Sequence, residues 1–435
     1  MTAIFPAAAL YVHIPFCRSR CIYCDFNTYG GVGEAERGRY HRALLQDLNA
    51  SAQLLKTYSP AADTGLQHFW MAGPRAFLNE GLKYAHGRSA LKSIYFGGGT
   101  PSYAPAVWLS EILDGIKKVF PVDEAAEITF EANPGTLCPQ KLYLFRQAGF
   151  NRMSLGVQSL DDKLLHKIGR IHNACEAVQA VSMARRAGFD NINLDLIYGL
   201  PGQTETVWRT TLQGIIELRP EHISCYALSV EEGTPLEKKL ASGIMTLPGD
   251  DECEAMENTR DALLSANGYR QYEISNYARD GKYCIHNLIY WNNLPYLGVG
   301  AGAVSYINGW RMTRQKLPDR YAELAAGGMY VCCEGERLSL LSRWREYLML
   351  GLRTVDGINT EYLWERFPKA LHCELKEWLQ SFCAELPPGL LKAEGRRLYL
   401  SQAGLRLSNE IFVRILEDGE LAHIFRRHNI DALRR

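Results

Sequence analysis

Six short apolar runs, separated by segments with helical periodicity, are the feature of this chain that most restricts its fold. The runs are residues 9–14, 93–96, 127–131, 152–156, 191–197 and 222–228, and the helical segments between them include residues 109–120, 139–148, 174–187 and 205–218. Strands that alternate with helices form parallel sheets with crossover helices. Six such units predict an α/β fold, a partial (β/α)6 barrel whose chemistry lies at the C-terminal ends of the strands.

Three cysteines follow the first apolar run directly, in the sequence Cys17-Arg-Ser-Arg-Cys21-Ile-Tyr-Cys24. Thiolates suit iron-sulfur ligation, and a tight loop lets all three converge on one cluster. Three thiolates at this spacing can hold three irons of a [4Fe-4S] cluster and leave the fourth iron open. Zinc is the alternative metal, but a structural zinc site usually needs four ligands, and His13 is the nearby fourth candidate.

Glycines and polar residues occur where the later strands should end. The sequence Gly-Gly-Gly-Thr-Pro at residues 97–101 follows the second run, and glycine lets the backbone approach a ligand closely. Glu131, Gln158 and Asp195 belong to the next three units, and a charge in an apolar strand is costly unless it is paired or bound. Taken singly, a simple turn or an ordinary core hydrogen bond explains each of them. Their occurrence in order, on successive units, indicates a common site.

The segment from Tyr11 to Phe26 resembles the radical S-adenosylmethionine (SAM) superfamily, and within it the branch that holds oxygen-independent coproporphyrinogen III dehydrogenases and the HemW family of haem chaperones. The dehydrogenases continue the cysteine run, after one intervening residue, to a fourth cysteine. Here Asp25 and Phe26 follow Cys24, so the resemblance is to the HemW family. Further motifs at residues 195–204 and 272–278 extend it over essentially the whole chain.

The resemblance implies that the open iron chelates SAM and that one electron, from a donor such as flavodoxin or ferredoxin, releases a 5′-deoxyadenosyl radical. It also implies which residues take part. Cys17, Cys21 and Cys24 would bind the [4Fe-4S] cluster, and the SAM contacts would be Tyr11, Tyr23, Gly98, Gly99, Thr100, Glu131, Gln158, Arg170, Asp195 and Ala227.

The sequence His286-Asn-x-x-Tyr290-Trp291 resembles a segment associated with haem binding in the HemW family. Imidazole is a usual ligand of haem iron, so His286 is the candidate ligand, with Cys284 as a local alternative. A structural histidine packed under aromatic rings is the competing interpretation. Val304 stands where chains of this family commonly carry histidine, which predicts weaker or differently ligated haem.

After residue 336 the composition turns to helix formers, at residues 339–352, 360–366, 372–384 and 403–416, with a two-stranded hairpin at 390–394 and 397–401. This pattern predicts a winged-helix-like α+β domain over residues 336–435, following a barrel with its extension over residues 1–335. Residues 57–90 look like an insertion between the first two strands. A domain of this kind often binds DNA, but the charge balance of the chain favours a lid or docking role.

The chain of 435 residues carries 48 basic and 48 acidic side chains, so no general attraction to nucleic acid is expected. Its 12 cysteines lack the density of a secreted disulfide framework, and neither a signal peptide nor a membrane-spanning run is evident. We therefore expect a cytoplasmic protein, with a peripheral place at the membrane as the alternative. The resemblance implies haem transfer to an acceptor apoprotein. Radical decarboxylation of coproporphyrinogen III, or another radical SAM reaction, is the alternative function.

Overall fold

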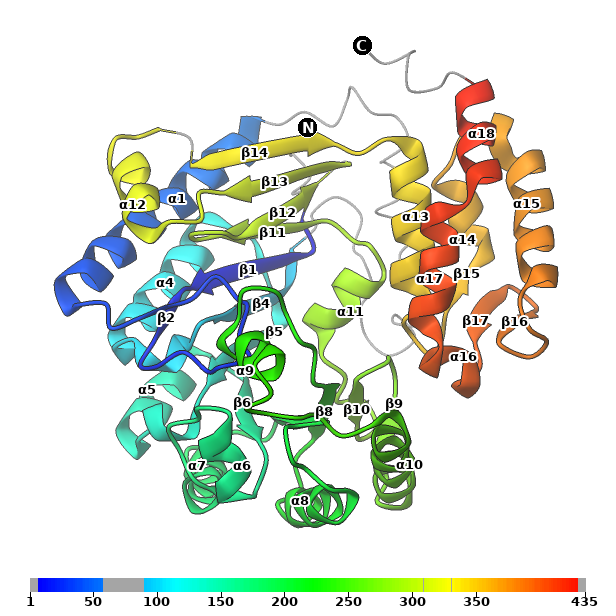
Figure 1. Ribbon diagram of the computed structural model, residues 1–435. Helices are drawn as coiled ribbons and strands as arrows, with labels where there is room; N and C mark the ends of the chain where they lie inside the picture. Colours follow the sequence, from blue (N-terminus) through cyan, green and yellow to red (C-terminus); the bar gives the residue numbers. More distant parts are fainter. Residues whose placement is uncertain (1–6, 58–89, 308, 330, 429–435) are drawn as a thin grey trace.

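The computed structural model describes residues 7–57, 90–307, 309–329 and 331–428 (Figure 1). The predicted insertion, residues 57–90, lies outside these ranges except for its two end residues. Six parallel strands are neighbours in chain order, which confirms the predicted α/β fold with a partial barrel. They are β1 (Ala9–Ile14), β4 (Leu91–Gly98), β5 (Val122–Ala132), β6 (Arg152–Gln158), β7 (Ile192–Tyr198) and β8 (His222–Ala227).

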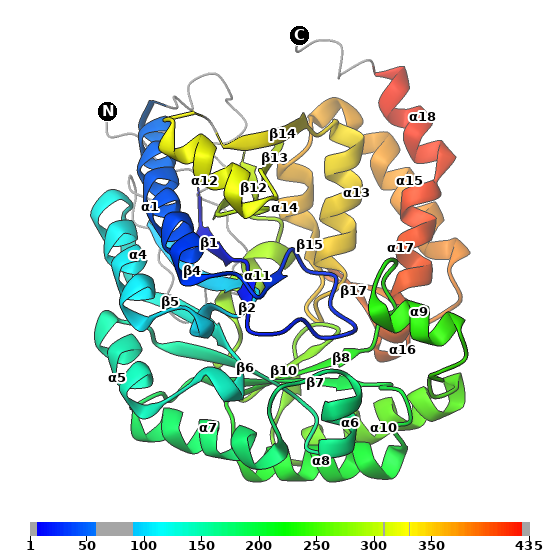
Figure 2. The same cartoon turned by 60° about the vertical axis from the view of Figure 1, so that its left-hand side comes forward.

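Helices cover the outer face of these strands (Figure 2). Local signals define their ends: Asn173 and Glu176 form a capping box at the start of α7, and Gly149, with a φ of 108°, ends α5 in the left-handed region. The predicted 139–148 helix is confirmed to the residue. The outer helices are α1 (Glu34–Thr57), α4 (Ala106–Val119), α5 (Pro139–Ala148), α7 (Ala174–Arg186), α8 (Glu205–Glu217) and α10 (Asp250–Ala266).

The sheet continues beyond the six predicted strands to a total of twelve. On one side, β11 (Tyr296–Val299) pairs in parallel with β1 and leads into the antiparallel strands β12 (Val304–Ile307), β13 (Trp310–Arg314) and β14 (Cys332–Arg337). On the other side, β10 (Asn276–Ala278) and β9 (Arg270–Gln271) extend the sheet past β8. The helix α11 (Ile285–Trp291) lies within the curve of the sheet, and α12 (Pro318–Ala326) packs on α1 (Figure 2).

The C-terminal part has a hydrophobic core of its own, built from residues between Trp344 and Phe425. We keep a domain boundary near residue 336 as a proposal, which this separate core supports. The predicted hairpin is confirmed, and the short strand Ile358–Asn359, which was not predicted, joins it in a three-stranded sheet. The expected final helix at 403–416 is wrong, because it is interrupted at Leu407 and followed by another helix. The elements are α13 (Leu340–Gly351), β15 (Ile358–Asn359), α14 (Thr360–Glu365), α15 (His372–Glu385), β16 (Leu391–Glu394), β17 (Arg397–Leu400), α16 (Gln402–Arg406), α17 (Ser408–Glu417) and α18 (Gly419–Arg427). None of the helices in the described part of the chain has the length and hydropathy needed to cross a membrane.

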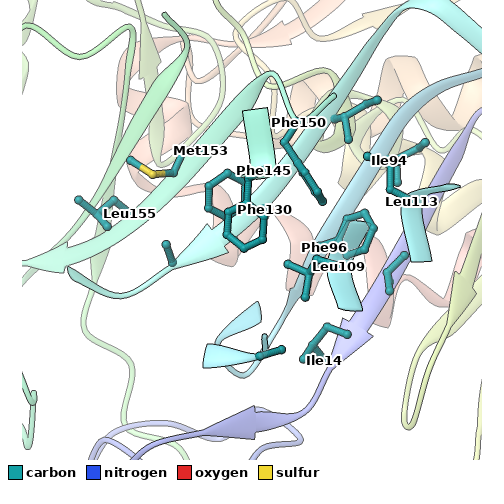
Figure 3. Close-up of a cluster of buried hydrophobic side chains, with 14 of the residues drawn as sticks. Ile14, Ile94, Phe96, Leu109, Leu113, Phe130, Phe145, Phe150, Met153 and Leu155 are labelled. Carbon is teal, nitrogen blue, oxygen red and sulfur yellow. The ribbon is translucent and has the colours of Figure 1, made fainter. Parts of the chain in front are cut away.

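An aromatic cluster fills the space between the strands and the outer helices (Figure 3). The ring of Phe130, on β5, lies 4.6 Å from that of Phe145 and 5.4 Å from that of Phe150, measured between centroids. These side chains are fully buried. Because Phe130 is only one residue before Glu131 on the same strand, the cluster fixes the strand end at which the candidate site residues lie.

We predict that Phe130→Ala lowers the free energy of unfolding by about 3–5 kcal/mol, because it leaves a cavity among rings that cannot collapse onto it. Chemical denaturation followed by circular dichroism measures this change. Tyr143→Ala is the control: Tyr143 is 57% exposed on α5, and its removal should change stability by less than about 0.5 kcal/mol. Equal effects of the two substitutions would contradict the packing described for Phe130.

Candidate functional site

The cysteine loop is fastened to the strand ends by backbone hydrogen bonds. After β1 ends at Ile14, the two-residue strand β2 (Phe16–Cys17) pairs in parallel with β3 (Tyr29–Gly30), which closes the loop at its base. In the middle of the loop, the Ile22 amide donates to the Ile168 carbonyl at 3.2 Å, and the Ile22 carbonyl accepts from the Leu236 amide at 2.9 Å. Residues that follow β6 and β8 therefore hold the loop over the barrel.

All three cysteine side chains keep some solvent exposure and lie near hydroxyl or guanidinium donors. The Thr100 hydroxyl lies 3.4 Å from the Cys17 sulfur, and Arg170 Nη1 donates to the Cys21 sulfur at 3.5 Å. Cys24 Sγ lies 3.9 Å from the Thr28 hydroxyl. Burial raises the pKa of the Cys17 thiol, and the hydrogen bond with Thr100 opposes that rise. The three sulfurs thus lie at one partly accessible end of the barrel, where Arg170 is the cationic neighbour of Cys21.

The proposed fourth zinc ligand, His13, is engaged elsewhere. Its Nδ1 lies 3.0 Å from the Tyr11 hydroxyl and its Nε2 lies 2.9 Å from the Asn27 carbonyl oxygen. In the described residues, no three His, Cys, Asp or Glu side chains are grouped so that they could hold one metal ion. In a [4Fe-4S] cluster each thiolate binds a different iron, so three sulfurs spread along a loop fit a cluster better than a single zinc ion.

The glycine-rich turn after β4 passes very close to the cysteine loop. A Cβ on Gly99 would lie 2.9 Å from the backbone of Pro15 and Phe16, and one on Gly98, with a φ of 113°, would lie 2.5 Å from the His13 ring. The turn is held there because the Thr100 amide donates to the Phe16 carbonyl at 2.9 Å. Glycine is therefore needed at positions 98 and 99, because a side chain there would separate the turn from the cysteine loop. The close contact between turn and loop brings Thr100 to the Cys17 sulfur.

Glu131 and Asp195 are two partly buried carboxylates on the inner side of the sheet. Glu131 accepts hydrogen bonds from the Tyr95 hydroxyl at 2.9 Å and the Gly98 amide at 3.1 Å. Asp195 accepts from the Ser154 hydroxyl at 2.9 Å and from Asn193 Nδ2 at 2.8 Å. Burial, and next the charge of Asp195, raise the pKa of Glu131 to about 7, and burial raises the pKa of Asp195.

The remaining predicted SAM contacts come from strand ends, from the segment after α6 (Asp162–Lys167), from the cysteine loop and, in the case of Tyr11, from the middle of a strand. Gln158 ends β6 with a φ of 69°, and its Oε1 is buried without a hydrogen-bond partner. Arg170, which follows α6, has an unpartnered buried Nε. Ala227 ends β8, and Tyr23 packs on an apolar cluster at the ends of β7 and β8. Tyr11 lies in the middle of β1, where its ring stacks on that of Tyr95 with the centroids 6.3 Å apart.

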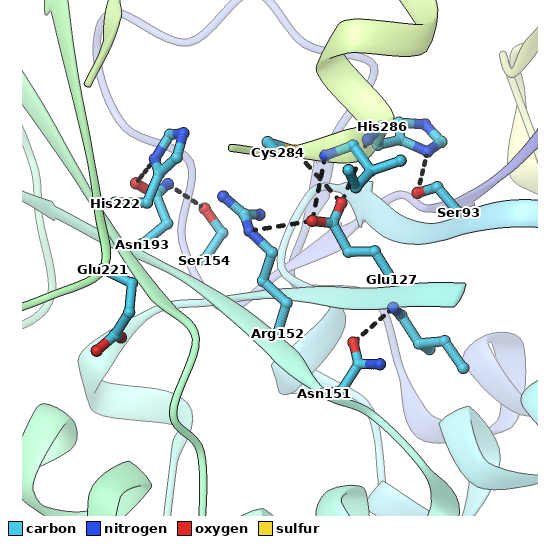
Figure 4. A network of polar contacts seen from close by, with 12 residues as sticks. Ser93, Glu127, Asn151, Arg152, Ser154, Asn193, Glu221, His222, Cys284 and His286 are labelled. Carbon is cyan, nitrogen blue, oxygen red and sulfur yellow. Dashed lines mark hydrogen bonds and ion pairs between the residues drawn. The ribbon is translucent and has the colours of Figure 1, made fainter. Parts of the chain in front are cut away.

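His286 does not lie at the strand ends with the other predicted residues. It is 1% exposed inside the barrel, on α11, in a network with Glu127, Arg152 and Cys284 (Figure 4). Its Nδ1 lies 2.9 Å from the Ser93 hydroxyl, and its Nε2 lies 2.8 Å from the hydroxyl of Tyr290. Burial, and next the charge of Arg152, lower the pKa of His286 to about 3, so the imidazole is neutral.

This geometry differs from the expectation of a free imidazole, because both ring nitrogens are occupied. Iron could reach His286 only if a hydroxyl moved away. The alternative ligand, Cys284, is buried too, with its sulfur 3.6 Å from a Glu127 carboxylate oxygen. Val304, on β12, offers no ligand atom.

One residue that the sequence analysis passed over connects the site. The side chain of Asn133, directly after β5, donates from Nδ2 to the Thr100 hydroxyl at 3.0 Å and accepts a hydrogen bond from Arg170 Nη2. The signal was present in the sequence Glu-Ala-Asn-Pro at residues 131–134. A polar residue after a buried strand, followed by proline, is typical of a strand-end turn.

We predict that Glu131→Gln stabilises the ligand-free protein, and more so at higher pH. Because the pKa of Glu131 is raised from 4.5 to about 7 on folding, the wild-type protein loses stability as the pH rises through that window. The difference in melting temperature between variant and wild type should grow between about pH 5 and about pH 8. Glu124→Gln, at an exposed position on the same strand, is the control and should show no such growth. A constant difference for Glu131→Gln would contradict the raised pKa.

Comparisons with known proteins show which family the chain belongs to. Residues 11–213 match the Radical SAM superfamily and residues 338–407 match the HemN C-terminal domain. The chain is 35% identical over 380 residues to heme chaperone HemW of Synechocystis, covering 86% of this chain and 83% of that protein. It is 33% identical to heme chaperone HemW of Bacillus subtilis, covering 94% and 99%.

The fold is also found in a solved structure. Coproporphyrinogen III oxidase (HemN) from Escherichia coli, a radical SAM enzyme, superposes with a TM-score of 0.75 at 22% identity, covering 94% of this chain and 90% of that one. At this identity the likeness shows the fold alone. The HemW relatives, which are more than 30% identical over most of both chains, show the family as well as the fold. The chain therefore belongs to the HemW family within the radical SAM superfamily.

Proposed function

We propose that this protein is a haem chaperone of the radical SAM type, which binds a [4Fe-4S] cluster, SAM and haem and passes haem to an acceptor apoprotein. The observation that carries the proposal is the arrangement of three cysteine sulfurs at one end of the barrel, two of them beside Thr100 and Arg170. Family membership supports it, because the relatives are named heme chaperones.

The chemistry of the donor set fits a cluster with an adjacent SAM site. Thr100 and Arg170 direct hydrogen bonds to thiolates, which favours the anionic form that iron requires. Gln158 Oε1 and Arg170 Nε, which have no partner within the described chain, offer an acceptor and a donor to a ligand. Glu131 and Asp195 are carboxylates suited to a cationic amine and to ribose hydroxyls. When bound, the cluster would supply an electron and SAM a deoxyadenosyl group.

Haem would bind at the segment that carries His286, Tyr290 and Trp291. A neutral imidazole with a free lone pair is what iron requires, and the low pKa of His286 keeps it neutral. The Tyr290 hydroxyl, 2.8 Å from Nε2, would have to move for iron to take that position. Ser93 would then hold Nδ1 and fix the orientation of the ring. Val304, in place of a histidine, supports weaker or different ligation.

The partners that this function requires are haem, a haem-accepting apoprotein and a one-electron donor such as flavodoxin or ferredoxin. We place the protein in the cytoplasm or at the periphery of the membrane, since the free cysteines suit a reducing compartment. Haem binding without turnover of coproporphyrinogen III separates this function from the dehydrogenase, which would convert that substrate, and from other radical SAM enzymes, which would bind no haem.

We predict that replacing Cys17, Cys21 and Cys24 together by Ala abolishes the iron-sulfur absorption after anaerobic reconstitution. The barrel should remain folded, because the cysteines lie on a loop outside the hydrophobic core. Iron and sulfide analysis measures the loss and circular dichroism checks the fold. Cys138, Cys175 and Cys373 are exposed elsewhere, and their joint replacement by Ala is the matched control, which should leave the cluster intact. Normal iron and sulfide content in the first variant would refute the cluster assignment.

We also predict opposite effects for the two partners in the haem segment. His286→Ala should weaken haem binding by about tenfold or more and diminish the Soret band, since a ligand is lost. Tyr290→Phe should keep or strengthen binding, because it frees Nε2. Both are read by titration with haem.

The control for this pair is His222→Ala, because His222 is equally buried and has both nitrogens hydrogen-bonded, to Asn193 and Tyr272, but lies outside the segment. It should leave the Soret band unchanged. If His286→Ala bound haem with an unchanged spectrum, His286 would not be the ligand. Loss of binding in Tyr290→Phe alone would assign the iron to the tyrosine oxygen, and unchanged binding in both variants would make Cys284 the next residue to test.

A further inference from the structure

A chain of side chains joins two of the cysteine sulfurs through Asn133. Starting at Cys17, the contacts run to the Thr100 hydroxyl at 3.4 Å and then to Asn133 Nδ2 at 3.0 Å. From Asn133 Oδ1 they run to Arg170, whose Nη1 donates to the Cys21 sulfur at 3.5 Å. The residues come from the ends of β4 and β5 and from the segment after α6. One amide therefore touches both groups that contact the two thiolates.

The orientation of this amide follows from its partners. A guanidinium has only donors, so the oxygen of the Asn133 amide must face Arg170. The NH2 group then faces Thr100 and donates to its hydroxyl oxygen. With that lone pair occupied, the Thr100 hydrogen is left to point at the Cys17 sulfur. Arg170 is held in turn, because its Nη2 also donates to the Gly156 carbonyl.

Hydrogen bonds to the thiolates of an iron-sulfur cluster stabilise its reduced form, because reduction adds negative charge to the sulfurs. Outer partners that orient such donors change the properties of the metal site without touching it. Asn133 meets this description. Within the described chain no hydrogen bond joins its own side chain to either sulfur, yet it holds the donors of both.

We propose that Asn133 is a positioning residue that sets the reduction potential of the cluster, by aiming Thr100 at Cys17 and Arg170 at Cys21. The proposal rests on the function proposed above, in that it requires the cluster on these cysteines. It predicts that the potential of the cluster depends on a residue that is not a ligand.

The test compares midpoint potentials after anaerobic reconstitution, by redox titration followed by electron paramagnetic resonance (EPR). Thr100→Val removes one donor and should shift the potential to a more negative value. Asn133→Ala releases both donors and should shift it further. Because Asn133 acts through Thr100, the double variant should match Asn133→Ala rather than the sum of the two shifts. Thr100→Ser keeps the hydroxyl and should retain the wild-type potential.

Ser102→Ala is the matched control, since this hydroxyl belongs to the same turn but bonds to Thr136, at 2.6 Å, instead of to a cysteine neighbour. It should leave the potential unchanged. Unchanged potentials in Thr100→Val, additive shifts in the double variant, or an equal shift in Ser102→Ala would overturn the proposal. Should Asn133→Ala fail to fold, an unchanged potential in Thr100→Val would still overturn the proposal. Failure of the wild-type protein to take up a cluster would instead refute the proposed function.

Discussion

The parallel hydrogen-bonded ladder from β1 to β8 is the constraint on which the rest of the structure depends. Every strand in it runs the same way, so the C-terminal ends collect at one edge, and residues distant in sequence meet there. The Thr100 hydroxyl contacts the sulfur of Cys17, 83 residues earlier in the chain, and Arg170 contacts the sulfur of Cys21, 149 residues earlier. The cysteine loop needs little structure of its own, because the Ile22 backbone bonds to segments that follow β6 and β8.

The same ladder also places charged side chains on its inner face, where their desolvation costs free energy. Arg152 offsets part of this cost. Its guanidinium lies 3.7 Å from Glu127, opposes the rise in pKa of Glu131 and Asp195, and lowers the pKa of His286. One buried cation therefore favours ionised carboxylates near the mouth of the barrel and neutral histidine at its floor. Ionised carboxylates suit the SAM proposed to bind near the mouth, and a neutral histidine suits the haem iron proposed to bind at the floor.

The elements that local sequence signals determine were predicted correctly, whereas the strands and side-chain contacts that depend on residues distant in the chain were missed. The 139–148 helix was placed to the residue because Pro139 and Gly149 mark its ends. The strands at 296–299, 304–307 and 310–314 were missed, because they are short and exist only through pairing with β1 and with one another. No pattern in the sequence could show that Ser93, 193 positions away, occupies a nitrogen of His286. The cysteine loop and the glycine-rich turn could be singled out because each has its own motif, whereas the linking role of Asn133 appears only once the ends of β4 and β5 and the segment after α6 are brought together.

The central claim is that three thiolates leave one iron open beside the strand-end residues, and SAM binding to that iron tests it most directly. EPR of the dithionite-reduced, reconstituted protein, recorded with and without SAM, measures this contact. A cluster with an open iron should change its g values when SAM is added, and SAM labelled with 17O or 15N at the methionyl carboxylate or amine should show hyperfine coupling to it. A spectrum that SAM leaves unchanged, on a protein with full iron and sulfide content, would contradict the account.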